Sequence, residues 1–190
     1  MSTRNPWTTL SSRIVVSNPW FKLRKDQVIR PDGKRGTYST VLAPNAVGVV
    51  PCFSDGTILL VGQYRYSIGQ YSWEIPEGGG EPGERPVQTA RRELREETGH
   101  RAKTIRSLGV MHTSNCFTNE KAYLYYATGL ESGVTQQDAT EEIASRRIHF
   151  DEAYAMAVSG KITDSITIVA LFRLQALGLL AAKASCARRS

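Results

Sequence analysis

The feature that most constrains this chain is the stretch from Gly78 to His100, which reads GGGEPGERPVQTARRELREETGH. Its first half is rich in glycine and its second half has the composition of a helix. Pro86 has the fixed φ that suits a first helical position, and Gly99 suits a left-handed C-terminal cap. The sequence therefore predicts a loop followed by a helix over residues 86–98.

The predicted helix carries three carboxylates on one flank. At about 100° per residue, Val87, Ala90 and Leu94 form an apolar stripe, with Glu93, Glu96 and Glu97 beside it. Like charges at these spacings destabilise a helix, and the macrodipole disfavours anions near its C-terminal end. Clustered carboxylates of this kind suit Mg²⁺ or Mn²⁺. The alternative is a solvated acidic face that the neighbouring arginines, Arg91, Arg92 and Arg95, partly neutralise.

The spacing of the whole stretch resembles the signature of the Nudix hydrolases. Gly78, Glu84 and residues 92–99 match its specified positions, and only the last position, usually aliphatic and here His100, departs from it. The resemblance implies a loop-helix-loop segment that holds divalent cations against a diphosphate. It also implies an enzyme that hydrolyses that diphosphate.

The resemblance extends beyond this stretch to the ADP-ribose pyrophosphatase branch of the family. It is carried by a Pro31-Asp32-Gly33 turn, by QYRY, WEIPEGG and TEEI, and it covers roughly residues 13–182. This branch exchanges a small N-terminal sheet between two subunits, which implies that residues 1–43 form a strand arm for a homodimer and residues 44–190 the Nudix domain. The segment after the signature lacks the proline-glycine pair common in this branch. The nucleotide sugar therefore stays open.

The resemblance also implies the metal ligands. Glu93 and Glu97 would be the main carboxylate ligands, Glu96 a third, and the backbone carbonyl of Glu77 a fourth. Arg92 would orient the carboxylates by ion pairing, with Glu84 as its structural partner, because metal ligands usually need such support.

The general base is expected outside the signature. Residues 136–142 are polar, carry three acids and suit a loop that closes on substrate. We expect Glu142 to be the base, with Glu141 next. A solvated acidic loop is the alternative, in which case Glu96 or Glu97 would share the activation of water. Glu120 is a further candidate that more readily suits substrate or metal binding.

Substrate recognition is expected from residues around two strands. Arg65 offers a planar donor fork to a phosphate, although a surface ion pair is equally compatible with its position. Glu74 is placed to accept hydrogen bonds from a ribose or to join the metal network. A base could stack on Phe21 or Trp20 of a partner's arm, or on Trp73, and packing in a core or interface is the alternative for each.

The apolar runs along the chain predict an α/β/α sandwich with a mixed central sheet, and a small antiparallel sheet at the N-terminus. Residues 46–53 and 57–64 predict a hairpin about Ser54-Asp55-Gly56, and their continuous apolar character predicts strands buried on both faces. The other predicted strands are residues 15–16, 20–29, 38–42, 105–111, 121–128 and 143–150, and the other predicted helices are residues 151–158 and 164–182.

The charge and cysteine content of the chain indicate which cellular compartment and which binding partners to expect. The net charge is +6, but residues 1–40 hold eight Lys or Arg against two Asp, so the catalytic body is mildly acidic. The basic arm lacks a groove-reading module, which argues against nucleic acid as a partner. Without a signal peptide, a spanning segment or paired cysteines, the chain is expected to be cytoplasmic, with Cys52, Cys116 and Cys186 reduced.

Three functions remain at this stage. The first is metal-dependent hydrolysis of a nucleoside diphosphate sugar, with ADP-ribose giving AMP and ribose 5-phosphate. The second keeps the chemistry but uses another nucleotide sugar or a dinucleotide. The third is a catalytically weak ligand-sensing module on the same fold, against which the intact Glu93, Glu96 and Glu97 argue.

Overall fold

The computed structural model describes residues 4–133 and 143–180. The chain divides into two compact units. The first comprises Met1–Pro44 and His112–Lys121, and the second comprises Asn45–Met111 and Ala122–Ser190. The first unit therefore contains a segment that lies far along the chain, directly after the signature helix and its following strand.

The first unit is built on an antiparallel sheet in the order β1-β2-β3, with strands Thr8–Ser17, Lys22–Ile29 and Arg35–Leu42. The predicted turn is present, since the Gly33 amide donates to the Arg30 carbonyl at 2.9 Å. The 112–121 segment attaches to β3. The Tyr38 hydroxyl donates to the Cys116 carbonyl at 2.7 Å, and the Val41 amide donates to the Phe117 carbonyl at 3.0 Å.

Large apolar side chains of the first unit lie exposed. Every residue of β1 is exposed, and the exposed apolar side chains of the unit include Leu10, Ile14, Val16, Trp20 and Phe21. Monomeric proteins seldom expose so many neighbouring apolar groups, so a surface of this kind is typical of an interface.

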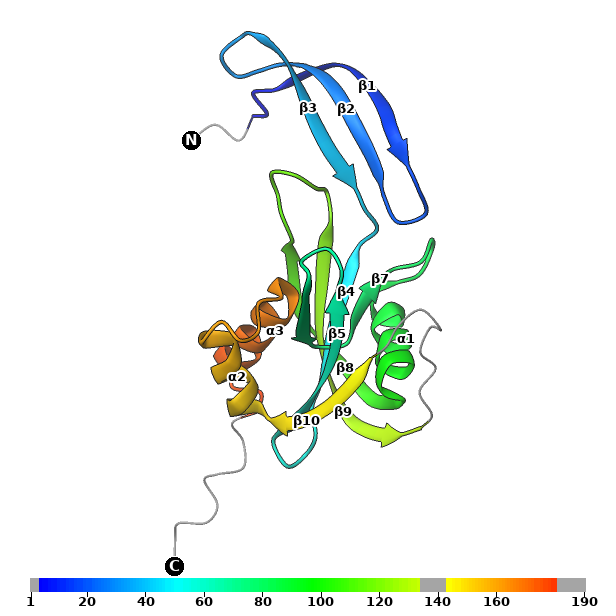
Figure 1. Ribbon diagram of the computed structural model, residues 1–190, viewed down its shortest axis with the longest axis vertical. Helices are drawn as coiled ribbons and strands as arrows, with labels where there is room; N and C mark the ends of the chain where they lie inside the picture. The colour runs from blue at the N-terminus through cyan, green and yellow to red at the C-terminus, as the bar shows by residue number, and fades with distance from the viewer. Residues whose placement is uncertain (1–3, 134–142, 181–190) are drawn as a thin grey trace, which may run out of the picture. The chain divides into compact units, whose positions relative to one another are not determined.

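The second unit contains a mixed sheet in the order β7-β4-β9-β8 (Figure 1). Its strands are β4 (Ala46–Pro51), β7 (Glu77–Gly79), β8 (His100–His112) and β9 (Lys121–Ser132). Strand β4 pairs with β9 in parallel and with β7 antiparallel. The predicted α/β class with a mixed sheet and a separate N-terminal antiparallel sheet is thereby confirmed.

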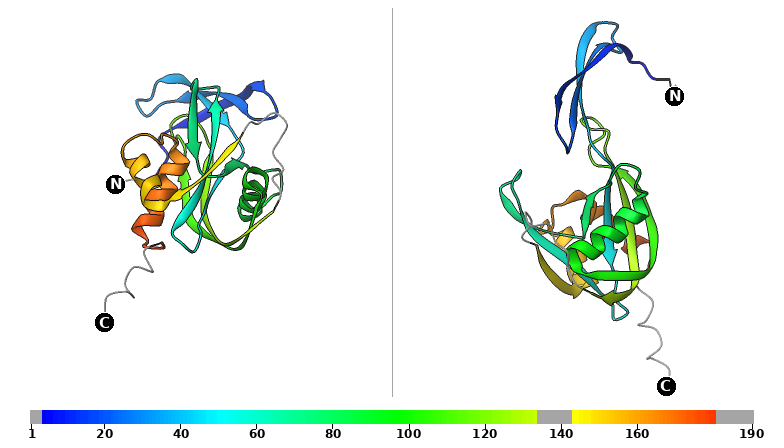
Figure 2. Two further views of the ribbon diagram at one scale, coloured as in Figure 1. Left: turned by 60° about the horizontal axis from the view of Figure 1, so that its bottom comes forward. Right: turned by 90° about the vertical axis from the view of Figure 1, so that its right-hand side faces the viewer.

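Helices cover both faces of β4 (Figures 1 and 2). Val47 and Val49 pack in one cluster with Ala90 and Leu94 of α1 (Pro86–Thr98). Val50 belongs to the other cluster, which holds side chains from both α2 (Phe150–Val158) and α3 (Ser165–Ala176). The prediction of a strand buried on both faces is correct. Alternate side chains of β4 face different helices.

The predicted hairpin of residues 46–53 and 57–64 is wrong in its pairing. Strand β5 (Thr57–Arg65) belongs to a second sheet, in the order β10-β5-β6, with β6 at Gln70–Glu74 and β10 at Ala144–His149. The turn itself forms, and one antiparallel bridge joins Cys52 to Ile58. Since β4 pairs on its two edges with β7 and β9, the strands diverge after this bridge. Cys52 is buried there, and burial raises the pKa of its thiol to about 12.

The C-terminal helix is shorter than predicted. Helix α3 begins at Ser165 and ends at Ala176, whereas the sequence predicted helix to residue 182. Gly178 has a φ of +62°, a left-handed conformation that ends helices. Across the described residues, no helix has the length and apolar character needed to cross a membrane.

Candidate active site

The signature forms the predicted loop and helix. Helix α1 begins at Pro86 and ends at Thr98, and Gly99 caps it with a φ of +72° while its amide donates to the Arg95 carbonyl. One detail differs from prediction. Glu93 and Glu97 lie on the buried face with Leu94, and Val87 is only half-buried. Two carboxylates are therefore held inside the protein rather than beside the apolar stripe.

Arg92 gathers the loop and the helix around one guanidinium. Its Nη1 lies 2.7 Å from Glu93 Oε1 and 3.0 Å from Glu96 Oε2, and its Nη2 lies 3.2 Å from Glu84 Oε2. The same Nη2 donates to the Gly79 carbonyl at 2.8 Å. A planar fork with several donors makes such bridging possible. This is the geometry expected of the positioning role that the sequence suggested for Arg92.

Glu84 is fixed as the anchor of this network. Burial opposes its ionisation, yet hydrogen bonds from Arg92, the Glu81 amide and the Thr89 hydroxyl lower the pKa of Glu84 below its usual value. The Thr89 Oγ1 donates to Glu84 Oε2 at 2.9 Å. Glu84 is therefore a charged partner for Arg92 at neutral pH.

Gly78 allows α1 to approach the loop backbone. A Cβ at this position would lie 2.1 Å from Glu93 Oε1 and 2.3 Å from its Cδ, far inside contact distance. The next residue, Gly79, has no atom within 4 Å of such a Cβ. The glycine that the signature specifies is thus the one whose side-chain space the Glu93 carboxylate fills.

The remaining buried carboxylate of α1 contacts the same loop. Glu97 Oε2 accepts a hydrogen bond from the Glu77 amide at 3.2 Å. The Glu77 amide therefore lies beside a carboxylate of α1.

A second carboxylate cluster lies where β5, β6, β7 and α3 meet. One oxygen each of Glu74, Glu77 and Asp164 lie within 4.8 Å of one another. Arg65 Nε donates to the Glu74 carboxylate oxygens at 3.0 and 3.1 Å, its Nη2 pairs with Glu74, and Nη2 lies 3.1 Å from Glu77 Oε1. Arg65 and Glu74, both predicted to bind substrate, are thus joined to each other.

This cluster contains three carboxylates and one guanidinium, and their proximity shifts the pKa values of Arg65 and Glu77. The hydrogen bonds to Glu74 raise the pKa of the Arg65 guanidinium above its usual value. Burial, with the neighbouring carboxylates of Asp164 and Glu74, raises the pKa of Glu77 well above its usual value. Glu77 Oε2 is buried and has no hydrogen-bond partner among the described residues.

Asp164 is a member of this site that sequence reasoning missed. It is the N-cap of α3, where its carboxylate accepts from the Thr167 amide at 2.6 Å. An aspartate before a helix has a sufficient local explanation as a cap. Its approach to Glu77 depends on tertiary structure, so the local sequence carried no signal for it.

The other predicted site residues fall into three groups. Glu120, Trp20 and Phe21 belong to the first unit, where Glu120 Oε2 accepts from the Thr113 hydroxyl at 2.7 Å and the Trp20 residue is 75% exposed. Trp73 packs edge-on against Tyr71 beside the core. Glu141 and Glu142 lie outside the described residues.

The donor set fits a hard divalent cation. The side chains that meet around the loop and α1 are carboxylates, the ligands that Mg²⁺ and Mn²⁺ prefer. These residues therefore suit the cation that the signature implies.

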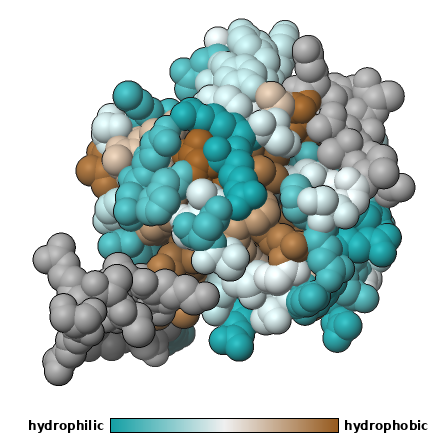
Figure 3. All heavy atoms as spheres, turned by 90° about the horizontal axis from the view of Figure 1, so that it is seen from below, coloured by the Kyte–Doolittle hydropathy of each residue, from teal (hydrophilic) through white to brown (hydrophobic). Residues whose placement is uncertain are grey.

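A cleft of about 750 Å³ has a different lining. It lies between the β4–β5 turn, the start of α2 and the end of α3, and its lining includes Phe53, His149 and Leu179. None of its lining residues belongs to either carboxylate cluster. Figure 3 views the molecule from below and shows hydrophobic residues on this face in patches bordered by hydrophilic ones.

The chain is similar to known proteins over most of its length. The chain is 36% identical over 176 residues to an ADP-ribose pyrophosphatase of Mycobacterium tuberculosis, covering 89% of this chain and 83% of the relative. It is 34% identical over 169 residues to a methanol dehydrogenase activator of Bacillus methanolicus, covering 88% and 91%. A solved structure described as an ADP compounds hydrolase shares the fold, with a TM-score of 0.83, 20% identity and coverage of 96% and 99%.

Two family models match consecutive parts of the chain. Residues 7–41 match the nucleoside diphosphate sugar hydrolase N-terminal domain, and residues 42–166, more than half of the chain, match the NUDIX domain. The second match contains the loop and helix that Arg92 holds together. The chain therefore belongs to the Nudix hydrolase family.

Proposed function

We propose that this enzyme hydrolyses the diphosphate of a nucleoside diphosphate sugar in the presence of a divalent metal ion, with ADP-ribose giving AMP and ribose 5-phosphate. The observation that carries the proposal is the single guanidinium of Arg92, which holds Glu84, Glu93 and Glu96 together with the Gly79 carbonyl. The similarity to an ADP-ribose pyrophosphatase and the N-terminal domain match support the substrate class.

Glu93, Glu96 and Glu97, with the backbone carbonyl of Glu77, would hold Mg²⁺ or Mn²⁺. When bound, the cations supply charge neutralisation of the two phosphates and stabilisation of the leaving group. The protein's own part is to hold these carboxylates in place before substrate arrives, through Arg92 and the Glu77 amide. Arg65 and Glu74 stand at the edge of the same loop, where they would orient the sugar and phosphate.

One observation in the sequence favours a substrate other than ADP-ribose. The segment His112-Thr113-Ser114-Asn115-Cys116-Phe117 lacks the proline-glycine pair common in ADP-ribose pyrophosphatases. Another nucleotide sugar or a dinucleotide is therefore the alternative to ADP-ribose. A ligand-sensing module is disfavoured because the carboxylates around Arg92 are complete.

A substrate panel tests the activity. Purified protein with Mg²⁺ is offered ADP-ribose, other nucleotide sugars and dinucleotides, and the released phosphomonoesters are identified by chromatography. We expect AMP and ribose 5-phosphate from ADP-ribose, and we expect Glu97→Gln to lose most of the turnover because one anionic ligand is gone while the shape stays.

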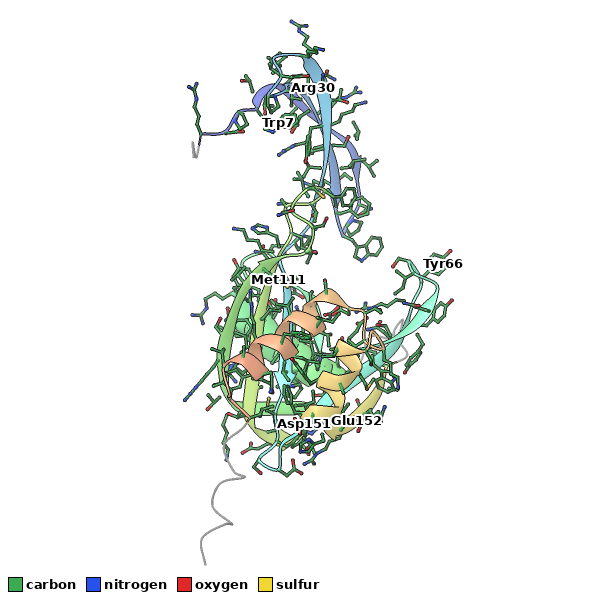
Figure 4. The ribbon with its side chains drawn as sticks, turned by 90° about the vertical axis from the view of Figure 1, so that its left-hand side faces the viewer. Trp7, Arg30, Tyr66, Met111, Asp151 and Glu152 are labelled. Atoms are coloured by element: carbon green, nitrogen blue, oxygen red, sulfur yellow. The ribbon has the colours of Figure 1, made fainter. Side chains whose placement is uncertain are left out.

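Glu152→Gln is the matched control. Glu152 lies exposed at the start of α2, paired with Arg146, and Figure 4 labels it beside Asp151. Its replacement should leave turnover unchanged. If Glu97→Gln keeps turnover within a few fold of wild type at saturating Mg²⁺, the assigned metal role is refuted.

For the general base we propose Glu142, with Glu141 next. If Glu142 activates the water, Glu142→Gln should lower kcat by about 10²-fold or more, with little change in metal or substrate affinity. Stopped assays at saturating substrate measure the change. If Glu142→Gln keeps its kcat while Glu141→Gln or Glu120→Gln loses most of it, the base is reassigned to that residue. If all three variants keep their kcat, water activation is assigned to Glu96 or Glu97.

We also propose a homodimer in the cytoplasm. The exposed apolar side chains of the first unit, including Ile14, Val16 and Trp20, support an arm that meets a second copy. In that arrangement Phe21 or Trp20 would stack on the base of the partner's substrate. The free thiols of Cys52 and Cys116 suit a reducing compartment.

A further inference from the structure

The carboxylates of Glu74, Glu77 and Asp164 form a cluster whose charge Arg65 does not balance. Three carboxylates and one guanidinium leave a net charge of −2 when all are ionised. Glu74 is 3% exposed, so water screens this charge poorly. Among the described side chains of the cluster, the carboxylates thus outnumber the one cation.

The cluster is held together by backbone contacts rather than by chance proximity of surface acids. The Asp164 carboxylate accepts from the Thr167 amide at 2.6 Å, and the Thr167 hydroxyl accepts from the Ile75 amide at 3.0 Å. Thr167 is fully buried. The first turn of α3 is therefore attached directly to the segment that carries Glu74 and Glu77, and the three carboxylates are fixed relative to one another.

One atom of the cluster has no partner. Glu77 Oε1 pairs with Arg65 at 3.1 Å, whereas Glu77 Oε2 is buried and accepts no hydrogen bond from the described residues. A buried carboxylate oxygen in this condition costs free energy unless a cation or donor reaches it. This observation is independent of the count of charges.

The spacing suits one metal ion. Ligand oxygens bind Mg²⁺ through Ca²⁺ at roughly 2.0–2.6 Å, so two oxygens on opposite sides of one ion lie about 4–5 Å apart. The three carboxylates each offer an oxygen within 4.8 Å of the others. This separation is compatible with all three carboxylates binding one ion.

We infer that Glu74, Glu77 and Asp164 form a second divalent-cation site, separate from the ligands on α1, which ties the loop to the start of α3. In this second site the Glu77 carboxylate binds the cation, whereas in the signature site the Glu77 backbone carbonyl would be the ligand. The inference concerns binding and does not depend on which substrate is hydrolysed.

Mn²⁺ is the probe, and electron paramagnetic resonance of free Mn²⁺ counts the ions bound to the full chain. The triple variant Glu93→Gln, Glu96→Gln and Glu97→Gln removes the α1 carboxylate ligands. We expect this variant to retain one Mn²⁺ site. Adding Asp164→Asn should weaken that site at least about 10-fold, the lower end of the losses seen even for outer-shell partners of metals.

Two features keep this test clean. Asparagine caps a helix as well as aspartate does, so Asp164→Asn removes charge while leaving α3 capped. Glu77→Gln in the same background is a second variant with unchanged shape, and Glu152→Gln is the control for a surface acid. Circular dichroism and thermal unfolding verify that each variant folds.

The outcomes separate the two proposals. If the triple variant binds no Mn²⁺, or if Asp164→Asn and Glu77→Gln bind it as tightly as their parent, Arg65 and a proton balance the cluster and the second site does not exist. Neither result touches the hydrolysis expected of the wild-type chain. Conversely, a chain that hydrolyses no nucleotide sugar yet loses one Mn²⁺ with Asp164→Asn would keep the site and lose the proposed function.

Discussion

At the scale of single residues, Gly78 is the most exacting position in the site. A methyl group there would lie 2.1 Å from Glu93 Oε1, so Gly78→Ala must displace either the Glu93 carboxylate or the loop. Misplacement of a catalytic group by about 1 Å can cost roughly 10²-fold in rate. We expect a loss of that order in kcat/KM, with weaker Mg²⁺ binding.

Gly79→Ala is the matched control for this prediction. Its Cβ would meet no atom within 4 Å, and its carbonyl would still accept from Arg92. Steady-state kinetics and Mg²⁺ titration of the two variants measure the contrast. Equal activity of Gly78→Ala and Gly79→Ala would mean that Glu93 does not need its observed position.

The residues of the site differ in how well the sequence predicted them. Arg92 and Glu84 could be paired from the signature, because both lie inside one loop-helix segment of fixed length. The burial of Glu93 and Glu97 could not be derived from helical periodicity, since that argument ranks positions by apolar character and the loop covers these two carboxylates. Asp164 could not be predicted as a member of the cluster, because only the tertiary fold brings it to Glu77.

At the scale of elements, the loop and α1 behave as one piece because a single side chain joins them. Arg92→Lys keeps the charge but replaces a planar fork by a point charge that cannot reach Glu84, Glu93 and Glu96 together. We expect a loss of about 10- to 100-fold in activity or metal affinity, the range found for residues that orient metal ligands.

The neighbouring Arg91 provides the comparison. Arg91 Nη1 donates to the Ala102 carbonyl at 2.9 Å and contacts none of the three carboxylates in the described hydrogen bonds. Arg91→Lys should retain activity, as measured by kcat at several Mg²⁺ concentrations. Matching losses in Arg91→Lys and Arg92→Lys would show that the effect is one of general charge or stability.

Elements with strong local signals were predicted well, and those decided by pairing were not. Pro86 and Gly99 bracket α1 because each has a backbone preference that acts within its own turn. The apolar runs on either side of Ser54-Asp55-Gly56 predicted two strands and a turn, all of which form. Their partners depend on which edges β7 and β9 occupy, and no local pattern carries that information.

At the scale of the whole molecule, the arm is predicted to complete a dimer. Deletion of residues 1–40 removes β1, β2 and most of β3, with exposed apolar side chains such as Leu10 and Ile14. We expect the shortened protein to be a monomer by light scattering and to bind substrate poorly, with a raised KM. A fully active monomer would contradict the role given to the arm.

The divergence of β4 and β5 makes the Cys52 thiol a natural probe of how often the two sheets separate. Cys52 lies at the single bridge where the two sheets separate, it is 2% exposed, and with a pKa of about 12 it stays a thiol at neutral pH. A reagent can reach this sulfur only when the seam opens, since thiolate formation needs solvent. The rate at which Cys52 is modified would therefore report how often the two sheets part, with no label added to the chain.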